Sequence, residues 1–574
     1  MCGISGIVGN TWKDWQLNAM LGSQAHRGPD DNGIYISNDH YAGLAHNRLS
    51  IIDLSPEAKQ PMFDASGRYS IVYNGEVYNY LEIKSTLATE FNFKTKSDTE
   101  VILYAYIKWG EGCLDRFIGM FSIAIWDEIE KKLWIARDRF GVKPLNYAFD
   151  QDNNFYFSSE IKALHAAGIS KEMNDATWAA YLGYGMYDNS INTFWKGVYK
   201  LSPGSILTLK DNEVKIKKWY DLFEHTGRDF DTASLEEVTE QYFALLEDSI
   251  RLRFRSDVPV GINLSGGLDS SALLALVNQV QGKDNNIKAF TFITGDDRYD
   301  ELPWVNEMIF ETRHELISCL LTAKEVPAMA ESVQMFEDEP FGGIPTLAYA
   351  RVFEEARKAG VIVLLDGQGI DEQWAGYDYY RNSNTIVSGP TIQGSKDSSV
   401  FPECYDPEFL ALSETMQMPE KYPDKLRNLQ YRDTFYTKIP RALRFNDRIS
   451  MRSSTELREP FLDHRLFEIA FRQPENFKIN EGTGKWFMRQ LLKTRLPGKV
   501  VEAPKRAVQT PQREWLRGEL KEWAETMLET AITQNGFLKG DKIREKWHNF
   551  VAGESDNSFY VWQWISLSLM HAKD

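Results

Sequence analysis

The sequence is poor in cysteine, with four residues of this type in a chain of 574. No two of them form a CxxC pair, so neither a structural zinc site nor a disulfide framework is indicated. A reducing cytoplasm is therefore the simplest compartment. We expect Cys113, Cys319 and Cys404 to be small buried hydrophobic residues. Cys2 differs from them because it directly follows the initiating methionine.

Long apolar runs and an excess of positive charge are also missing. No run of about 18 apolar residues is present to span a bilayer, and the N-terminus lacks the basic and apolar segments of a secretory signal. The 65 lysines and arginines are outnumbered by 82 aspartates and glutamates, which gives a formal net charge of −17. Such a charge excludes a nucleic-acid partner unless the fold gathers a basic patch.

The first part of the chain, residues 1–210, has the pattern of an α+β domain with antiparallel sheets. Short apolar segments alternate there with clusters of Gly, Pro, Asn and Asp, which is typical of strands joined by turns. We expect helices at Leu81–Leu87 and Thr99–Trp109. The expected strands include Gly3–Val8, Gly43–Ile52, Tyr69–Tyr73, Phe121–Trp126, Leu133–Arg137 and Phe155–Ser158.

The pattern changes after a polar segment, residues 211–232, which we interpret as a connector. Ser234 and Glu237 then form a capping-box pattern ahead of an apolar helical stripe. The runs IKAFTFIT (287–294) and VIVLLDG (361–367) are typical of buried strands in a parallel sheet. Residues 233–574 are thus predicted to form an α/β parallel-sheet domain with a helical tail. The polar stretch Arg381–Ser399 is predicted to be a mobile loop.

Cys2 is a candidate nucleophile because of its position. If the methionine is removed, Cys2 carries both a thiol and a free α-amine. The reference pKa of an α-amine is about 7.7–8.0, so this amine can take the proton of the thiol without help from a histidine. N-terminal threonine nucleophiles work in the same way. The alternative is that Cys2 is simply the first residue of a buried strand.

The segments that follow Cys2 favour the nucleophile. They are AHRGPDD (25–31), AHNRLSIIDLS (45–55), YNGEVYNY (73–80), SDTEVIL (97–103), GMFSIAIWD (119–127) and ARDRFGVKPL (136–145). Together with MCGI, these motifs resemble the class II glutamine amidotransferase domain over nearly all of residues 1–200. The resemblance implies an N-terminal-nucleophile (Ntn) hydrolase, an αββα sandwich in which Cys2 hydrolyses glutamine.

Residues within these motifs have the chemistry that glutamine requires. Arg48 can hold the α-carboxylate through two hydrogen bonds, and Asp98 with Glu76 can accept from the α-ammonium. The side chain of Asn74 and the backbone N–H of Gly75 can donate to the oxyanion that forms when the thiolate attacks. The alternative is that Arg48 and Asp98 form a solvated surface pair. By resemblance, the same pocket includes backbone at Leu49, Ile51 and Ile52.

A second motif, VGINLSGGLDSSALL (260–274), predicts a strand, a glycine turn and a helix. Glycines allow backbone N–H groups to approach phosphate oxygens, and a helix N-terminus favours negative charge. The P-loop pattern is absent, and SGGLDSS instead resembles the pyrophosphate loop of ATP pyrophosphatases. An acidic residue in a phosphate loop indicates a bridging cation, so Asp269 is predicted to bind Mg²⁺. The alternative is a plain turn before a structural helix.

Later segments extend this resemblance. DEPF (338–341), DGQGIDEQWAGY (366–377), LRFNDRISM (443–451), EPFLDHRL (459–466), GKWFMRQLL (484–492) and APKRAVQTP (503–511) stand in the order of the synthetase domain of the asparagine synthetase family. The resemblance covers residues 235 to about 520. It implies ATP contacts at Leu264, Ser265, Gly266, Gly267, Asp269, Ser270, Phe292, Asp366 and Gly367.

The same resemblance assigns roles to further charged residues. Asp371 is implied as a second Mg²⁺ ligand. Lys505 resembles a lysine that neutralises charge on the adenylated intermediate and the leaving pyrophosphate, a need that adenylation chemistry creates. A solvated Lys505 is the alternative. Arg448 and Lys485 are additional candidates for contact with phosphate or substrate.

Two departures from the family pattern affect the predicted acceptor. Asparagine synthetases usually carry an acidic residue where this chain has Gln368, and a neutral amide can neither hold a metal nor act as a base as a carboxylate does. REPF (458–461) also departs from the usual valine-containing form. Both concern the acceptor more than the ATP chemistry.

The sequence therefore predicts a glutamine-dependent, ATP-consuming amidotransferase. Ammonia made at Cys2 would cross an internal passage and amidate an acyl-adenylate, with release of AMP and pyrophosphate. L-Aspartate is the first candidate acceptor; the others are a uronic acid of a surface polysaccharide, a peptidoglycan or peptide carboxyl, and a natural-product precursor. A non-catalytic sensor of glutamine and nucleotide, and a plain glutaminase, are the competing classes. By analogy with relatives, a homodimer is left open.

Overall fold

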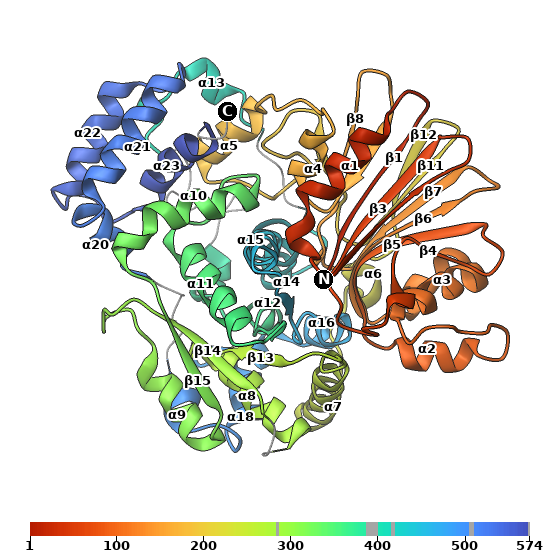
Figure 1. Cartoon of the computed structure of the whole chain (residues 1–574). Helices are drawn as coiled ribbons and strands as arrows, with labels where there is room; N and C mark the ends of the chain where they lie inside the picture. Colours follow the sequence, from red (N-terminus) through yellow and green to blue (C-terminus); the bar gives the residue numbers. More distant parts are fainter. Residues whose placement is uncertain (283–285, 386–399, 415–418, 504–509, 572–574) are drawn as a thin grey trace.

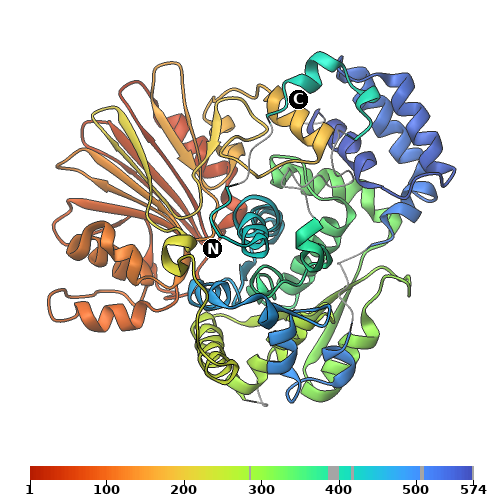
Figure 2. The ribbon, with the colours of Figure 1, turned by 180° about the vertical axis from the view of Figure 1, so that it is seen from behind.

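The computed structural model of the chain describes residues 1–574 with the exception of 283–285, 386–399, 415–418, 504–509 and 572–574. Two halves lie side by side, one built on antiparallel sheets and the other on a parallel sheet (Figure 1). The N-terminus lies between the halves rather than at the outer surface, which the view from behind also shows (Figure 2). The predicted fold class is thereby confirmed.

The first half is a sandwich of two six-stranded antiparallel sheets. In spatial order, one sheet contains β10 (Val198–Lys200), β8 (Asn146–Phe149), β9 (Phe155–Ser158), β1 (Gly3–Val8), β3 (Ala42–Arg48) and β2 (Asp31–Ile36). The other contains β12 (Glu213–Lys218), β11 (Ser205–Lys210), β7 (Lys132–Arg137), β6 (Gly119–Asp127), β5 (Tyr69–Val77) and β4 (Met62–Phe63).

Helices cover both outer faces of the sandwich, which completes an αββα arrangement. The first sheet contacts α1 (Asp14–Ser23) and α4 (Ile161–Ala166), and the second contacts α3 (Asp98–Trp109), which packs on α2 (Tyr80–Leu87). Successive side chains of a strand point to opposite faces. In β1, Ile4 packs between the sheets and Ile7 packs toward α1. This arrangement explains why the whole of β1 is apolar and buried.

The observed elements match most of the expected ones in the first half. The expected strand Gly43–Ile52 ends at Arg48, because the chain then turns to line a pocket. The segment 211–232, expected to be a connector, contains β12, which pairs with β11 along its whole length, and the short helix α6 (Leu222–Thr226). Its polar composition fits an edge strand, which has one face in water.

The second half is built on a five-stranded parallel sheet. Its strands in spatial order are β15 (Glu315–Leu320), β14 (Lys288–Ile293), β13 (Val260–Asn263), β16 (Val363–Leu365) and β17 (Glu456–Arg458). Helices cover both faces with their apolar sides, as a parallel sheet requires. They include α7 (Leu235–Arg253), α8 (Leu268–Gln281), α9 (Leu302–Thr312), α10 (Val326–Glu337) and α11 (Ile344–Lys358).

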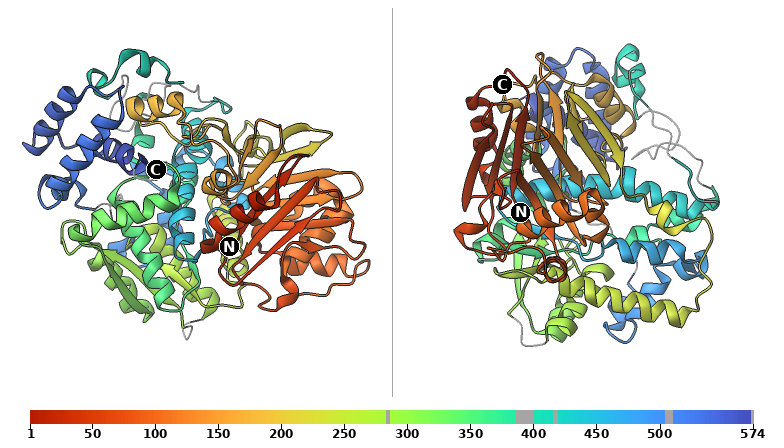
Figure 3. Two further views of the ribbon diagram at one scale, coloured as in Figure 1. Left: turned by 45° about the horizontal axis from the view of Figure 1, so that its top comes forward. Right: turned by 90° about the vertical axis from the view of Figure 1, so that its right-hand side faces the viewer.

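One long helix occupies the boundary between the halves. The cyan ribbon of α15 (Lys438–Arg452) lies between the two halves in Figure 3. α15 contacts α10 and α11 on one side and the short helix η1 (Ala25–Arg27) of the first half on the other. It follows α14 (Lys425–Arg432) and one π-helical turn, η7 (Asp433–Thr437). The chain continues through β17 to α16 (His464–Arg472) and α18 (Trp486–Leu492). Side chains of α15 can therefore contact both halves of the molecule.

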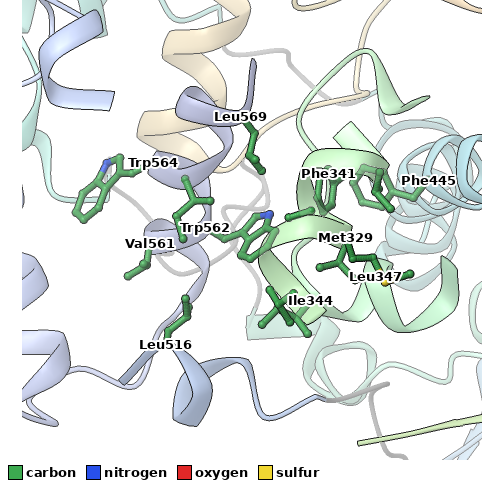
Figure 4. Packing of buried hydrophobic residues seen from close by; sticks show 14 of the residues in the cluster. Met329, Phe341, Ile344, Leu347, Phe445, Leu516, Val561, Trp562, Trp564 and Leu569 are labelled. Carbon is green, nitrogen blue, oxygen red and sulfur yellow. The ribbon is translucent and has the colours of Figure 1, made fainter. Parts of the chain in front are cut away.

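The predicted helical tail consists of α20 (Gln512–Arg517), α21 (Lys521–Gln534), α22 (Gly540–Val551) and α23 (Phe559–His571). Figure 4 shows Trp562 of α23 facing Phe341 and Ile344, so the tail packs into the core beside α10 and α11. A helix that is apolar all round is buried all round. The tail is thus an integral part of the second half.

Two smaller expectations can be compared with the structure. The loop predicted at Arg381–Ser399 is wrong at its start, because the 3₁₀ helix η5 (Asp378–Thr385) includes its first residues, while 386–399 lie outside the described residues. All four cysteines lie in the described part of the chain, where each is buried and none is paired. Among the described residues, no helix combines the length and apolarity needed to cross a membrane.

Candidate active sites

The first candidate site is a small pocket around Cys2, at the start of β1. It is walled by the end of β5, the first turn of α3 and the chain that follows β3. Seven of the residues predicted to bind glutamine line it, namely Arg48, Leu49, Ile51, Ile52, Gly75, Glu76 and Asp98. Residues far apart in the sequence therefore meet around one sulfur atom.

Asn74 and Gly75, on β5, face the start of the chain. The backbone N–H of Cys2 donates to Oδ1 of Asn74 at 3.0 Å, and Nδ2 of Asn74 has no hydrogen-bond partner in the described part of the chain. Gly75 has a φ of +152°, and a Cβ at this position would lie 2.1 Å from the carbonyl oxygen of Met120. The site therefore contains a free amide donor beside backbone that only glycine can form.

Arg48 is held by backbone carbonyls rather than by acidic side chains. Its Nη1 donates to the carbonyl of Ser55 at 2.8 Å and its Nη2 donates to the carbonyl of Asp53. Within the described residues it forms no ion pair with an acid. A guanidinium fixed in this way, lining a pocket, is suited to bind a carboxylate from outside the chain.

The acids opposite Arg48 are buried. Oδ2 of Asp98 accepts from the hydroxyl of Tyr73 at 2.9 Å and from the N–H of Val77 at 3.0 Å. Burial is the main cause that raises the pKa of Asp98 to about 6. Burial likewise raises the pKa of Glu76, and nearby Glu456 raises it further. A bound cation would lower both pKa values, so these two carboxyls are suited to receive an ammonium group.

Met1 fills the space that a ligand would need. Its side chain is 1% exposed, and it leaves a cavity of only about 30 Å³, too small for an amino acid. Its α-amine donates to Oε2 of Glu456 at 2.8 Å. Burial raises the pKa of the Cys2 thiol in this form, although the Met1 amine lowers it. Removal of Met1 would both open the pocket and transfer the terminal amine to Cys2.

The second candidate site is a cavity of about 500 Å³ at the carboxyl edge of the parallel sheet. This edge is where open α/β sheets bind ligands. Among the predicted ATP contacts, those that line the cavity are Ser265, Gly266, Gly267, Asp269, Ser270, Asp366 and Gly367. Asp371 and Gln368 line it as well. Leu264 and Phe292 are not among its lining residues and are buried in the hydrophobic core.

The turn from β13 to α8 has the geometry of an anion-binding loop. Gly266 adopts a φ of +71°, and Gly267 is the N-cap of α8, which begins at Leu268. A Cβ on Gly367 would lie 3.0 Å from the backbone nitrogen of Ser270, so the chain after β16 runs against the first turn of α8. The loop thus presents bare backbone at a helix N-terminus.

Lys485 joins the two predicted metal ligands. Its Nζ lies 2.7 Å from both carboxylate oxygens of Asp269 and 2.7 Å from Oδ1 of Asp371. Burial would lower the pKa of Lys485, but the two carboxylates raise it above its ordinary value. Within the described residues no group of three or more His, Cys, Asp and Glu side chains could hold a metal. Two converging carboxylates do fit Mg²⁺, which usually takes its remaining ligands from phosphates and water.

Several cavity residues were not predicted from the sequence. Lys438 and Arg441 reach it from α15, and Tyr349, Glu301 and Arg489 also line it. The spacing of Lys438 and Arg441 puts both on one face of a helix, but nothing in the sequence indicates that this face meets the sheet.

Two further predicted residues lie elsewhere. Arg448 lies at the boundary between the halves, where its Nη1 donates to the carbonyl of Ser159 at 3.0 Å, and it does not line the second cavity. Lys505 lies outside the described residues.

An αββα sandwich with a pocket at its N-terminal cysteine, followed by a parallel-sheet domain with a glycine loop, defines a two-domain glutamine amidotransferase. Residues 1–220 match the glutamine amidotransferase domain family, and residues 241–572 match the asparagine synthase family. The chain belongs to the asparagine synthase family and is a glutamine-hydrolysing ligase that forms C–N bonds.

Curated relatives agree over most of the chain. A glutamine-hydrolyzing asparagine synthetase 1 of Bacillus subtilis is 28% identical over 97% of this chain and 93% of the relative. Asparagine synthetase 2 of the same organism is 30% identical over 88% of this chain and 71% of the relative. A protein named amidase chry2, from Gibberella zeae, is 27% identical over 91% of this chain and 89% of the relative.

Proposed function

We propose that this protein hydrolyses glutamine at Cys2 and uses the ammonia to convert an ATP-activated carboxylic acid into its amide. The observation that carries the proposal is the gathering of Cys2, Arg48 and Asp98 in one pocket. A second cavity combines the glycine loop with Asp269 and Asp371. A glutaminase does not need the second cavity, and a binding-only sensor does not need the nucleophile Cys2 in the first. The proposed domains are the glutaminase at 1–210, a connector at 211–232 and the synthetase at 233–574.

The chemistry at Cys2 follows from the groups around it. In a chain that starts at Cys2, the α-amine takes the thiol proton and the thiolate attacks the glutamine amide carbon. Nδ2 of Asn74 and the N–H of Gly75 would stabilise the oxyanion. The protonated α-amine then returns its proton to the amide nitrogen, the C–N bond breaks and ammonia leaves, and water hydrolyses the remaining glutamyl thioester. Arg48 would hold the α-carboxylate, while Asp98 and Glu76 would hold the α-ammonium.

In the second cavity the residues are suited to ATP and Mg²⁺. Bare backbone at Gly266 and Gly267 would bind phosphate oxygens, and Asp269 with Asp371 would hold Mg²⁺, which neutralises phosphate charge when bound. Lys485 contributes a further positive charge between these carboxylates. We assign Lys505 the task of stabilising charge on the acyl-adenylate and the leaving pyrophosphate.

Aspartate, which would give asparagine, is the first proposed acceptor. Its support is the family and the activity for which the relatives from Bacillus subtilis are named. Another carboxylate is the second candidate, and a specific observation favours it. Gln368 lines the cavity where an acidic residue is expected, with Lys438 and Arg441 in the same wall. A relative of similar identity is named an amidase, so the relatives are not all named for one activity.

The test is pyrophosphate release with glutamine, MgATP and a panel of acids. We expect release that depends on aspartate, with asparagine formed in equal amount. Release with a uronic acid, a peptide carboxyl or another acid alone would transfer the proposal to that acceptor. No release with any acid, together with intact glutamine hydrolysis, would contradict the synthetase half of the proposal.

A further inference from the structure

The short strand β17 touches both candidate sites. Oε2 of Glu456 accepts from the Met1 amine at 2.8 Å, and Nη2 of Arg458 lies 3.4 Å from Oε1 of Glu76 in the glutamine pocket. The carbonyl of Arg458 accepts from the backbone N–H of Asp366, which lines the ATP cavity, at 2.9 Å. Two residues of one short strand, Glu456 and Arg458, therefore connect the site that releases ammonia with the site that consumes it.

Glu459 directly follows β17, just as Asp366 directly follows β16. Since neighbouring parallel strands end at the same edge of a sheet, and Leu365 pairs with Arg458, the two carboxyls lie side by side. Glu459 is 4% exposed, and its Oε2 has no hydrogen-bond partner among the described residues. A buried polar atom without a partner costs free energy. A group from outside the chain, such as water or ammonium, could supply the missing hydrogen bond.

Charged groups surround Glu459 from both halves of the molecule. Lys143 approaches from the first half, where its Nζ contacts the carbonyl of Leu457 at 3.5 Å. Arg253 comes from α7, Asp366 from the sheet edge and Asp447 from α15. Burial is the largest cause that raises the pKa of Glu459 to about 8, with Asp366 and Asp447 raising it and Lys143 and Arg253 lowering it. This carboxyl can therefore change its protonation state near neutral pH.

We propose that Glu459 receives the ammonia released at Cys2 and hands it, deprotonated, to the ATP cavity beside Asp366. The inference rests on the proposed function and deepens it. Ammonia that has taken a proton from water, leaving hydroxide, would bind to the Glu459 carboxylate as ammonium. Before attack, one proton passes from the ammonium nitrogen to the Glu459 carboxylate oxygen, which restores the nitrogen lone pair. No bond to carbon forms or breaks in this step, and Glu459 later releases the proton to solvent.

The variant Glu459→Gln tests the inference, because it keeps the shape of the side chain and removes its proton exchange. With glutamine, MgATP and the acid that supports pyrophosphate release in the wild type, glutamine hydrolysis should be unchanged. Exchange of pyrophosphate into ATP with the acid alone should also be unchanged. Amide formed per glutamine hydrolysed should fall roughly tenfold or more, with ammonia accumulating in solution. Glu519→Gln, at an exposed position, is the matched control.

The pH profile separates proton exchange from a structural role. Amide formation from glutamine should rise with an inflection near the pKa of Glu459, about 8, in the wild type, because only the ionised carboxylate can accept the proton. This inflection should be lost in Glu459→Gln and kept in Glu519→Gln. Amide formation coupled one to one with hydrolysis in Glu459→Gln, or an unchanged profile, overturns the inference.

A second measurement does not depend on the acceptor. Infrared difference spectra of the whole protein near pH 7 should show a buried protonated carboxyl band that disappears when ammonium chloride replaces sodium chloride. The band should be absent from Glu459→Gln. If ammonium leaves it unchanged, the inference is wrong even where the proposed function holds. Should the band respond while no acid supports pyrophosphate release, the proposed function fails and ammonium binding at Glu459 stands.

Discussion

At the scale of single residues, each candidate site contains a positively charged side chain, and the groups that hold this side chain in place differ between the two sites. Among the described residues, Arg48 donates hydrogen bonds to backbone carbonyls and forms no ion pair with an acid, whereas Lys485 pairs with two acids, Asp269 and Asp371. The first arrangement leaves a cation available to an external carboxylate. The second keeps two carboxylates together that would otherwise repel each other. Each arrangement suits the ligand proposed for its pocket.

Asp371→Asn tests this interpretation of the second cavity. Removal of one carboxylate weakens the proposed Mg²⁺ site and leaves Lys485 with Asp269 alone, so pyrophosphate release should fall roughly 100-fold or more. Glutamine hydrolysis at Cys2 should remain, because the two cavities share no lining residue. The exposed Asp541→Asn serves as control. Pyrophosphate release at the wild-type rate in Asp371→Asn would show that Asp371 holds no metal needed for the reaction.

At the scale of elements, the positions of strand ends determine both sites. β5 places Asn74 and Gly75 opposite the start of β1, and β13, β16 and β17 end together at one edge of the parallel sheet. Gly75 is closely packed, since its pair across β5 and β6 is Phe121 and the carbonyl of Met120 lies in the way of any side chain.

Gly75→Ala should therefore be costly. The new methyl group would overlap the carbonyl oxygen of Met120 in a backbone conformation that favours glycine, so we expect a loss of at least about 2 kcal/mol in the free energy of unfolding. Glutamine hydrolysis should be lost as well, because the oxyanion donors move. Gly498→Ala is the control, because apart from its neighbours along the chain no atom of the described residues lies within 4 Å of its Cβ position. Chemical denaturation of both variants checks the difference, and equal stability would contradict this account.

Much of the element structure could be predicted from the sequence, and for physical reasons. Both faces of the strand Gly3–Val8 are buried, so the strand is largely apolar. The apolar run in the sequence therefore begins and ends where the strand does. The capping box at Ser234 marks the start of α7 in the same way. Gln368, Asp371 and the SGG loop carry recognisable chemistry at fixed spacing, which is why the sequence could predict residues that the structure places around one cavity.

Other features could not be predicted, because they depend on tertiary contacts that leave no local pattern. The pairing of the Met1 amine with Glu456 joins positions 455 residues apart. Lys438 and Arg441 have the pattern of solvated helix positions, and only the placement of α15 beside the sheet brings them to the cavity. The pairing of β12 could not be predicted because an edge strand with one exposed face has the composition of a linker. The roles of the predicted site residues remain predictions, although most of them converge in the two pockets.

At the scale of the whole molecule, a buried ion-pair network holds the two halves together. Arg27 of the first half donates to Asp447 on α15 at 2.8 and 3.1 Å and to Glu160 at 2.7 Å. Lys162 pairs with Asp338 across the same boundary at 3.2 Å. These buried charges fix the orientation of the halves, and β17 lies beside them.

Asp447→Asn tests that network. It leaves the buried Arg27 with Glu160 as its acidic partner, so the free energy of unfolding should fall by about 3 kcal/mol. Burial alone would raise the pKa of Asp447, but Arg27 lowers it below its ordinary value of 3.8. The stabilisation is therefore present above that pH and lost as the pH falls, and the difference between variant and wild type should shrink in acid.

The matched control removes one charge from an ion pair at the surface. Glu172 contacts Lys196 at the surface, where both side chains are more than half exposed, so Glu172→Gln should leave stability unchanged. Denaturant titrations at neutral and acidic pH check both variants. Equal effects of Asp447→Asn and Glu172→Gln would mean that the buried network does not stabilise the boundary.

The central claim is that one chain releases ammonia at Cys2 and consumes it in a separate cavity. Its most direct test is the variant Cys2→Ala, assayed for pyrophosphate release with the acceptor acid and MgATP, first with glutamine and then with ammonium chloride. We predict that activity with glutamine is abolished, because no nucleophile remains, and that activity with ammonium is retained at the wild-type level. Retained activity with glutamine, or loss of both activities in a folded variant, would contradict the account.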